Sequence, residues 1–144
     1  MEKIFGLEDG KILSYPTVKD AMSKNVVTVD ADSTVETACR IMGEKRIGSV
    51  IVTKEGKPIG IFTERDLLSK IILRNVDIRA AKVEEFMSKP LVTIKPETSL
   101  REAARIMAQL HVRRLPVVDV EGRLLGIFTS ADLSSALAKY TLTF

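Results

Sequence analysis

The spacing of apolar residues predicts two amphipathic helices. Apolar residues recur at intervals of three and four at two places: Val35, Ala38, Cys39 and Met42, and Leu100, Ala103, Ala104 and Met107. This spacing places them on one helix face, which is typical of a face turned toward a core. We therefore expect Cys39, Met42 and Met107 to be packing residues.

Runs rich in β-branched residues predict the strands. They cover residues 26–29, 49–53 and 58–62 in the first half, and 91–94, 115–118 and 124–128 in the second. The loops KEG and DVEG contain glycine and predict a hairpin in each half. Further helices are expected over 64–72 and 130–139. The order β-α-β-β-α therefore occurs twice, which indicates an α/β fold.

The chain is a tandem repeat. Met22-Ser23-Lys24 recurs as Met87-Ser88-Lys89, and GIFTERDL at 60–67 recurs as GIFTSADL at 126–133. The offset between the copies is 65 residues and becomes 66 after an inserted residue near Val120. The repeat predicts these boundaries: an extension at 1–17, a first copy at 18–72, a linker at 73–82, a second copy at 83–137 and a tail at 138–144.

A copy of about 55 residues buries too little surface to be stable alone. We therefore expect the two copies to pack sheet to sheet around one core, with a pseudo-twofold axis, and residues 73–82 to cross between them.

Four sequence patterns predict helix starts. Ser33-x-x-Glu36 and Ser99-x-x-Glu102 are typical of capping boxes. Thr63-x-x-Asp66 and Thr129-x-x-Asp132 follow apolar strands directly. A single such pattern is typical of a helix cap, and its occurrence in two copies favours part of a ligand site, because a helix N-terminus favours anionic groups.

Composition narrows the function classes. The chain of 144 residues has one cysteine, so no internal disulfide is possible, and no metal-ligand cluster is evident. It lacks a membrane-length apolar run and a signal-peptide pattern, which favours a cytoplasmic protein. The net charge of +3 is mild and aromatic residues make up 5%, so nucleic-acid binding is kept only as an alternative.

These motifs resemble those of cystathionine-β-synthase (CBS) domains, in the tandem arrangement called a Bateman module. DAMSKNVVTV, EFMSKPLVTI, LPVVD and the two GIFT segments carry the resemblance, which covers residues 18–137. It implies a regulatory module that binds AMP, ADP, ATP, S-adenosylmethionine or a dinucleotide, pairs through its helices as a homodimer and acts on a separate effector protein. A structural dimer with empty clefts is the other alternative.

The resemblance also implies which residues bind ligand. One cleft would combine Thr129 and Asp132 with Thr28 and Ile47-Gly48-Ser49; the other would combine Thr63 and Asp66 with Thr93 and Val112-Arg113-Arg114. The aspartates would hold ribose hydroxyls, and we favour Asp132 because small residues stand in its cleft. The candidates for phosphate contact are Arg113, Arg114, Arg46, Arg65 and His111.

An enzyme is the reading that the residues favour least. His111 has no serine or cysteine beside it in a nucleophile pattern, and the chain has no phosphate-binding loop of the Walker type. We therefore expect no catalytic residues, no metal and no required cofactor.

Overall fold

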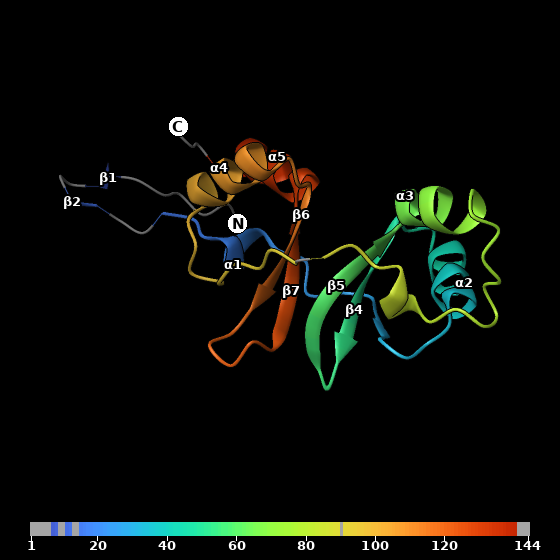
Figure 1. The fold of residues 1–144 in the computed structure, drawn as a ribbon. Helices are drawn as coiled ribbons and strands as arrows, with labels where there is room; N and C mark the ends of the chain where they lie inside the picture. The colour runs from blue at the N-terminus through green and yellow to red at the C-terminus, as the bar shows by residue number, and fades with distance from the viewer. Residues whose placement is uncertain (1–6, 9–10, 13–14, 90, 141–144) are drawn as a thin grey trace. The chain divides into compact units, whose positions relative to one another are not determined.

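The structure is a computed structural model that describes residues 7–8, 11–12, 15–89 and 91–140. The chain forms two compact units, one of residues 26–91 and one that combines residues 1–25 with 92–144 (Figure 1). Both contain helices and a small sheet, so the predicted α/β fold with two repeats is confirmed.

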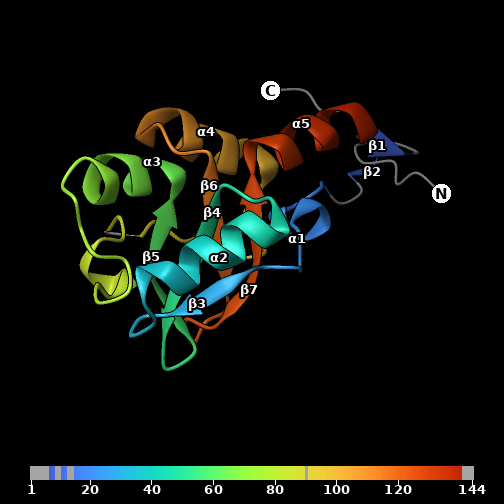
Figure 2. The same cartoon turned by 90° about the vertical axis from the view of Figure 1, so that its right-hand side faces the viewer.

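The 26–91 unit is built on a three-stranded sheet. Strand β3 (Thr28–Asp30) pairs in parallel with β4 (Ser49–Lys54), which forms an antiparallel hairpin with β5 (Lys57–Thr63). Helix α2 (Val35–Lys45) connects β3 to β4, and α3 (Glu64–Asp66) continues as the π-helix η1 (Leu67–Ile72) after β5 (Figures 1 and 2). The core is apolar and includes Val35, Ala38, Met42, Val50, Val52, Phe62 and Ile71.

The segment after η1 stays with this unit. Residues 73–82, which the repeat boundaries place in a linker, lie inside the 26–91 unit, and Ala81 is part of its core. The 3-10 helix η2 (Val83–Glu85) follows, and Val83 is fully buried. Ser88 then pairs with Ile61 of β5 through two backbone hydrogen bonds of 2.7 and 3.1 Å. The beginning of the second sequence copy therefore packs on the first.

The unit of residues 1–25 and 92–144 has a similar arrangement. Here the start of the first sequence copy packs on the strands of the second copy. This unit contains β1 (Leu7–Glu8), β2 (Lys11–Ile12), α1 (Val18–Ala21), α4 (Leu100–Leu110), β6 (Arg114–Val118), β7 (Leu124–Thr129) and α5 (Ser130–Lys139). Strands β1 and β2 form an antiparallel pair, as do β6 and β7. Ser23 pairs with Ile127 of β7 through two backbone hydrogen bonds of 2.9 Å each. Val18, Leu100, Ala103, Met107, Leu115, Val117 and Phe128 are among its core residues.

Both repeated glycines lie where a neighbouring segment comes close. A Cβ on Gly60 would stand 2.4 Å from Sδ of Met87, and one on Gly126 would stand 2.6 Å from the carbonyl oxygen of Ser23. A side chain at Gly126 would collide with backbone, and one at Gly60 would require the Met87 side chain to shift. The repeated Met-Ser-Lys and Gly-Ile-Phe-Thr phrases are thus contact partners of one another, each in its own unit.

The predicted strand over 91–94 is wrong in extent. Among the described residues there, only Ile94 forms a bridge, in parallel with Val117. In the first copy the N–H of Ile51 donates to the carbonyl of Val27, at 3.1 Å. The equivalent of Ile51 is Pro116, which has no N–H to donate, so this rung of the ladder cannot form.

One predicted helix cap is also wrong. The cap of α2 is Thr34, whose hydroxyl accepts from the N–H of Thr37 at 3.1 Å, and not Ser33. The Ser33 carbonyl instead accepts from Val83 N–H at 2.8 Å, which holds the chain extended at that point. Ser99 caps α4 as expected, accepting from Glu102 N–H at 3.0 Å.

Candidate functional site

The two Thr-x-x-Asp segments form the same local structure. Thr63 and Thr129 are extended, with φ of −118° and −112°, and each caps the helix that follows. Each threonine hydroxyl accepts from the N–H of its aspartate, at 3.2 Å for Thr63 and 3.1 Å for Thr129. Each aspartate returns the bond through Oδ2, accepting from its threonine's N–H at 2.9 Å. The repeated sequence therefore produces two equivalent capping boxes.

The chain before the hairpin reaches each junction within the same unit. Gly48 carbonyl accepts from Glu64 N–H at 3.0 Å, and Arg113 carbonyl accepts from Ser130 N–H at 2.9 Å. The structure therefore brings residues 47–49 together with Thr63–Asp66, and residues 112–114 together with Thr129–Asp132. The expected pairing of 47–49 with Asp132 and of 112–114 with Asp66 stays a prediction.

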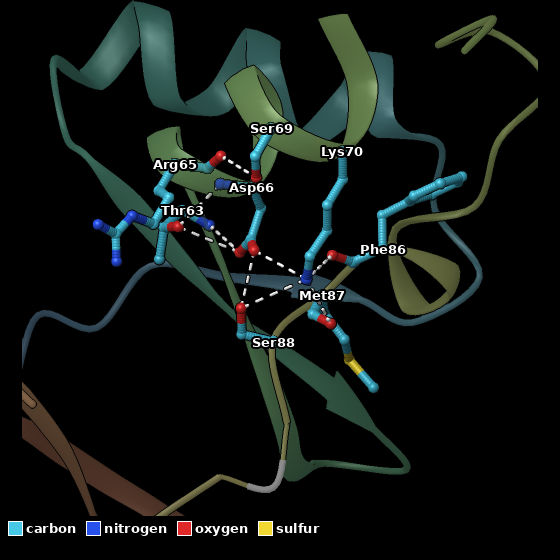
Figure 3. Close-up of polar contacts among 8 residues, drawn as sticks. All are labelled: Thr63, Arg65, Asp66, Ser69, Lys70, Phe86, Met87 and Ser88. Carbon is cyan, nitrogen blue, oxygen red and sulfur yellow. Dashed lines mark hydrogen bonds and ion pairs between the residues drawn. The ribbon is translucent and has the colours of Figure 1, made fainter. Parts of the chain in front are cut away.

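The carboxylate of Asp66 is held by four donors. Oδ2 accepts from the N–H and the hydroxyl of Thr63, the latter at 3.1 Å. Oδ1 accepts from the hydroxyl of Ser88 at 2.7 Å and forms an ion pair with Nζ of Lys70 at 2.9 Å. Figure 3 shows Lys70 and Ser88 converging on this oxygen. A carboxylate has about four acceptor positions, and Asp66 is only 3% exposed, so its acceptor positions are all used within the unit.

Lys70 contacts more than Asp66. Its ammonium also donates to the carbonyl oxygens of Phe86 and Met87, at 3.0 and 3.4 Å (Figure 3). It therefore links η1 to the segment that leads into Ser88. This lysine was missed from the sequence, although its position four residues after Asp66 is the spacing at which helical ion pairs form.

The carboxylate of Asp132 is largely unused. Its Oδ2 accepts from Thr129 N–H, and among the residues that the structure describes its Oδ1 has no hydrogen-bond partner. The residue at the position of Lys70 is Ala136, and Ser23, at the position of Ser88, accepts from Asn25 N–H at 3.3 Å instead. Asp132 is also half-buried rather than buried. It therefore retains acceptor positions for a ligand.

Exposed cations lie beside the Asp132 junction. Arg113 and Arg114 are exposed, and their side chains have no hydrogen bond or ion pair to any described residue. His111 is exposed as well, and closes α4 in a left-handed conformation with φ of 54°.

The remaining predicted site residues are exposed or half-buried. Arg46 ends α2, also with φ of 54°, and Arg65 lies in α3; both are exposed. Thr28 is exposed in β3 and pairs with Ile51. Thr93 is exposed, and Ile47, Ser49 and Val112 are half-buried.

Other chemistry is sparse in the described part of the chain. Its His, Cys, Asp and Glu side chains form no group of three or more that could hold a metal ion. Burial raises the pKa of the Cys39 thiol, which lies half-buried against the core of the 26–91 unit. The helices that the structure describes include none long and apolar enough to cross a membrane.

A family model described as the CBS domain matches residues 18–73 and 83–139. The chain belongs to the CBS-domain family. It is 36% identical over 118 residues to the CBS domain-containing protein YhcV of Bacillus subtilis, covering 82% of this chain and 83% of YhcV. Two CBS domains thus account for both copies of the repeat.

Other relatives are longer than this chain. Protein MK0525 of Methanopyrus kandleri is 36% identical over 121 residues, covering 81% of the chain and 60% of that protein, so the chain spans less than two thirds of it. A homoserine O-acetyltransferase of Methanohalobium evestigatum is 30% identical over 144 residues, and there the match covers 28% of the enzyme. Enzyme names among the relatives thus belong to larger proteins that contain a CBS region.

Two similar solved structures contain adenosyl ligands. CBSX2 in complex with AMP has a TM-score of 0.75 and 28% identity, covering 85% of this chain and 96% of that one. The CBS domain pair of protein MJ0100, with 5′-methylthioadenosine and S-adenosyl-L-methionine, has a TM-score of 0.76 and 28% identity, covering 87% and 98%. Both of these similar proteins therefore hold an adenosine-containing compound.

Proposed function

We propose that this protein is a regulatory module that binds an adenosyl compound, with the ribose held by Asp132. The observation that carries the proposal is the Oδ1 atom of Asp132, which has no partner among the described residues and lies at the start of α5. The adenosyl ligands of the two similar structures support the class of compound.

The chemistry of the junction fits a vicinal diol. One carboxylate can accept hydrogen bonds from both ribose hydroxyls, since each of its oxygens carries two acceptor positions. The N–H of Thr129 already donates to Oδ2 of Asp132. The orientation of the carboxylate is therefore set before a ligand binds. A carboxylate oriented in advance loses less entropy on binding than a mobile one.

Phosphate groups on the ligand would find cations at the same junction. The Arg113 carbonyl bonds to Ser130 N–H, so the chain at Arg113 and Arg114 lies at the first residue of α5. Guanidinium groups suit phosphate because they offer paired donors. The N-terminus of α5 adds a partial positive charge.

The remaining predicted contacts belong to the same proposal. Arg46, Arg65 and His111 are further phosphate candidates. The ligand at Asp132 would also be contacted by Thr28, Ile47, Gly48 and Ser49, whereas Thr63, Thr93 and Val112 are the predicted contacts of the second cleft, with Asp66. Asp66 was predicted as a second ribose acceptor, and its internal bonds make it the weaker candidate.

The binding event would regulate rather than catalyse. A ligand shifts a conformational equilibrium only by its difference in affinity for the two states. We propose that the module forms a homodimer through its helices and passes the shift to a separate effector protein. Light scattering with and without the bound compound tests the assembly.

The test of the function is a binding screen. Thermal unfolding is measured with AMP, ADP, ATP, S-adenosylmethionine, NAD and short DNA, at low and moderate salt. A compound present at about a hundred times its dissociation constant adds about 2.7 kcal/mol of stability. The shift should occur in the wild type and in Glu44→Gln, an exposed control in α2, and be absent in Asp132→Asn. A shift that persists in Asp132→Asn would contradict the proposal, and a salt-sensitive shift with short DNA alone would favour nucleic-acid binding instead.

A further inference from the structure

The helices that follow the two aspartates differ at several positions, and one of these differences affects the carboxylate directly. Lys70 stands four residues after Asp66, and Ala136 stands four residues after Asp132. Both junctions keep the same capping bonds, and both have a serine, Ser88 or Ser23, bridged to the isoleucine two positions before the threonine. Among the side chains that differ between the two junctions, the lysine is therefore the one that bonds to the carboxylate itself.

Lys70 and Ser88 place hydrogen-bond donors at the positions where a ribose diol would place its own. Its ammonium lies 2.9 Å from Oδ1 of Asp66, and the Ser88 hydroxyl donates to the same oxygen at 2.7 Å. A diol also presents two hydrogen-bond donors to a carboxylate. The two donors at Asp66 therefore take the acceptor positions that the diol needs, while the matching positions on Asp132 are open.

The lysine is fixed in this role by contacts beyond the carboxylate. The Phe86 and Met87 carbonyls also accept from Nζ, and the side chain is 31% exposed. Lys70 belongs to η1, a π-helix, whereas the corresponding residues after Asp132 continue the α-helix α5. A ligand would have to displace an ammonium that has several acceptors, so an intramolecular group competes with it at Asp66.

We infer that Lys70 closes the Asp66 junction to ribose, so that each chain binds one adenosyl compound, at Asp132. This inference rests on the proposed function and goes beyond it by assigning the stoichiometry to a single side chain. Removal of the lysine should open a second site of the same class.

The test is a calorimetric titration with AMP and, separately, S-adenosylmethionine. For a compound that the wild type binds, we expect one site per chain in the wild type, two in Lys70→Ala, none in Asp132→Asn and one in the double variant Lys70→Ala/Asp132→Asn. Lys54→Ala, an exposed lysine at the end of β4, is the matched control and should keep one site.

A second variant guards against loss of folding. Lys70→Met keeps the apolar stem and removes only the ammonium, and the second site is expected in whichever variant keeps the wild-type circular dichroism and a cooperative transition. One site in both folded Lys70 variants would overturn the inference and leave the proposed function standing, as would two sites in the wild type. No binding in the wild type or in any variant would remove both.

Discussion

The β5–α3 and β7–α5 junctions share a sequence phrase, a backbone conformation and a pair of capping bonds, yet their aspartates are in opposite conditions. Asp66 is buried and bonded to Thr63, Lys70 and Ser88, whereas Asp132 keeps an oxygen without a partner among the described residues. The phrase sets the geometry of the carboxylate. A residue one helical turn later decides whether that carboxylate is available.

The largest expected effect is a difference in the free energy of unfolding between variants of the two aspartates. Asp66→Ala leaves the Lys70 ammonium without its counter-ion in a mostly buried position and should cost about 3 kcal/mol, because breaking a buried pair strands a charge. Asp132→Ala removes one helix-capping carboxylate and should cost about 1 kcal/mol. Urea unfolding measures both, and equal losses would contradict the difference described between the junctions.

The next effect compares the glycines of the two copies. A Cβ at Gly126 meets a backbone carbonyl at 2.6 Å, whereas at Gly60 the nearest atoms belong to the flexible Met87 side chain. Gly126→Ala should therefore cost about 2–3 kcal/mol and Gly60→Ala about 1 kcal/mol in unfolding experiments. Gly43→Ala in α2, with no atom within 4 Å, is the control and should gain about 0.5–1 kcal/mol. A greater loss at Gly60 would show that the Met87 side chain cannot move aside.

A smaller effect distinguishes the two hairpin loops. In the β6–β7 loop, Oδ1 of Asp119 accepts from the N–H groups of Glu121 and Arg123, both at 2.9 Å. These bonds, first that from Arg123, lower the pKa of Asp119 below its ordinary value. The stabilisation is therefore fully present above the pKa that an aspartate has in the unfolded chain, which is about 4. It is lost as the pH falls below that value and through the lower pKa of Asp119 in the folded protein.

Asp119→Asn tests this pH dependence. The difference in melting temperature between the wild type and the variant should shrink as the pH is lowered from neutral into that acid range. The β4–β5 loop has glutamate and glycine at its left-handed positions, Glu55 and Gly56, so Glu55→Gln serves as the comparison variant. A difference that stays constant with pH would rule out the carboxylate as its source.

The smallest effect concerns the first helices of the two copies. Cys39 in α2 corresponds to Ala104 in α4, and burial raises the pKa of the Cys39 thiol. Less thiolate is then present near neutral pH, so Cys39 should react with a disulfide reagent more slowly in the folded protein than in urea. Equal rates would mean that the thiol is not protected by the fold. Cys39→Ala, which copies the second repeat, should cost less than about 1.5 kcal/mol.

The repeat and the hairpins could be predicted because each is encoded locally. Glycine loops, β-branched runs and the Thr-x-x-Asp caps depend on neighbours a few residues away. The strand expected at 91–94 failed because its partner strand carries Pro116, an effect of a residue distant in sequence. The cap at Thr34 was missed because the Ser33 carbonyl is bonded to Val83, again through a distant contact.

The sequence could predict the residue types of the candidate site. It could not predict which aspartate is bonded within the protein and which has an acceptor position without a partner among the described residues. Asp66 and Asp132 occupy the same position in the two phrases, and alignment alone makes them equivalent. Their difference requires knowing that Ser88, from the start of the second copy, packs on the first and meets Asp66 together with Lys70. Such exchange of segments follows from tertiary packing, which a local pattern does not encode.

The most direct test is a crystal structure of this protein grown with AMP. We predict ribose hydroxyls on the Asp132 carboxylate, with Asp66 still bonded to Lys70 and Ser88. A ribose on Asp66 with Lys70 displaced, or AMP bound without contact to Asp132, would contradict it.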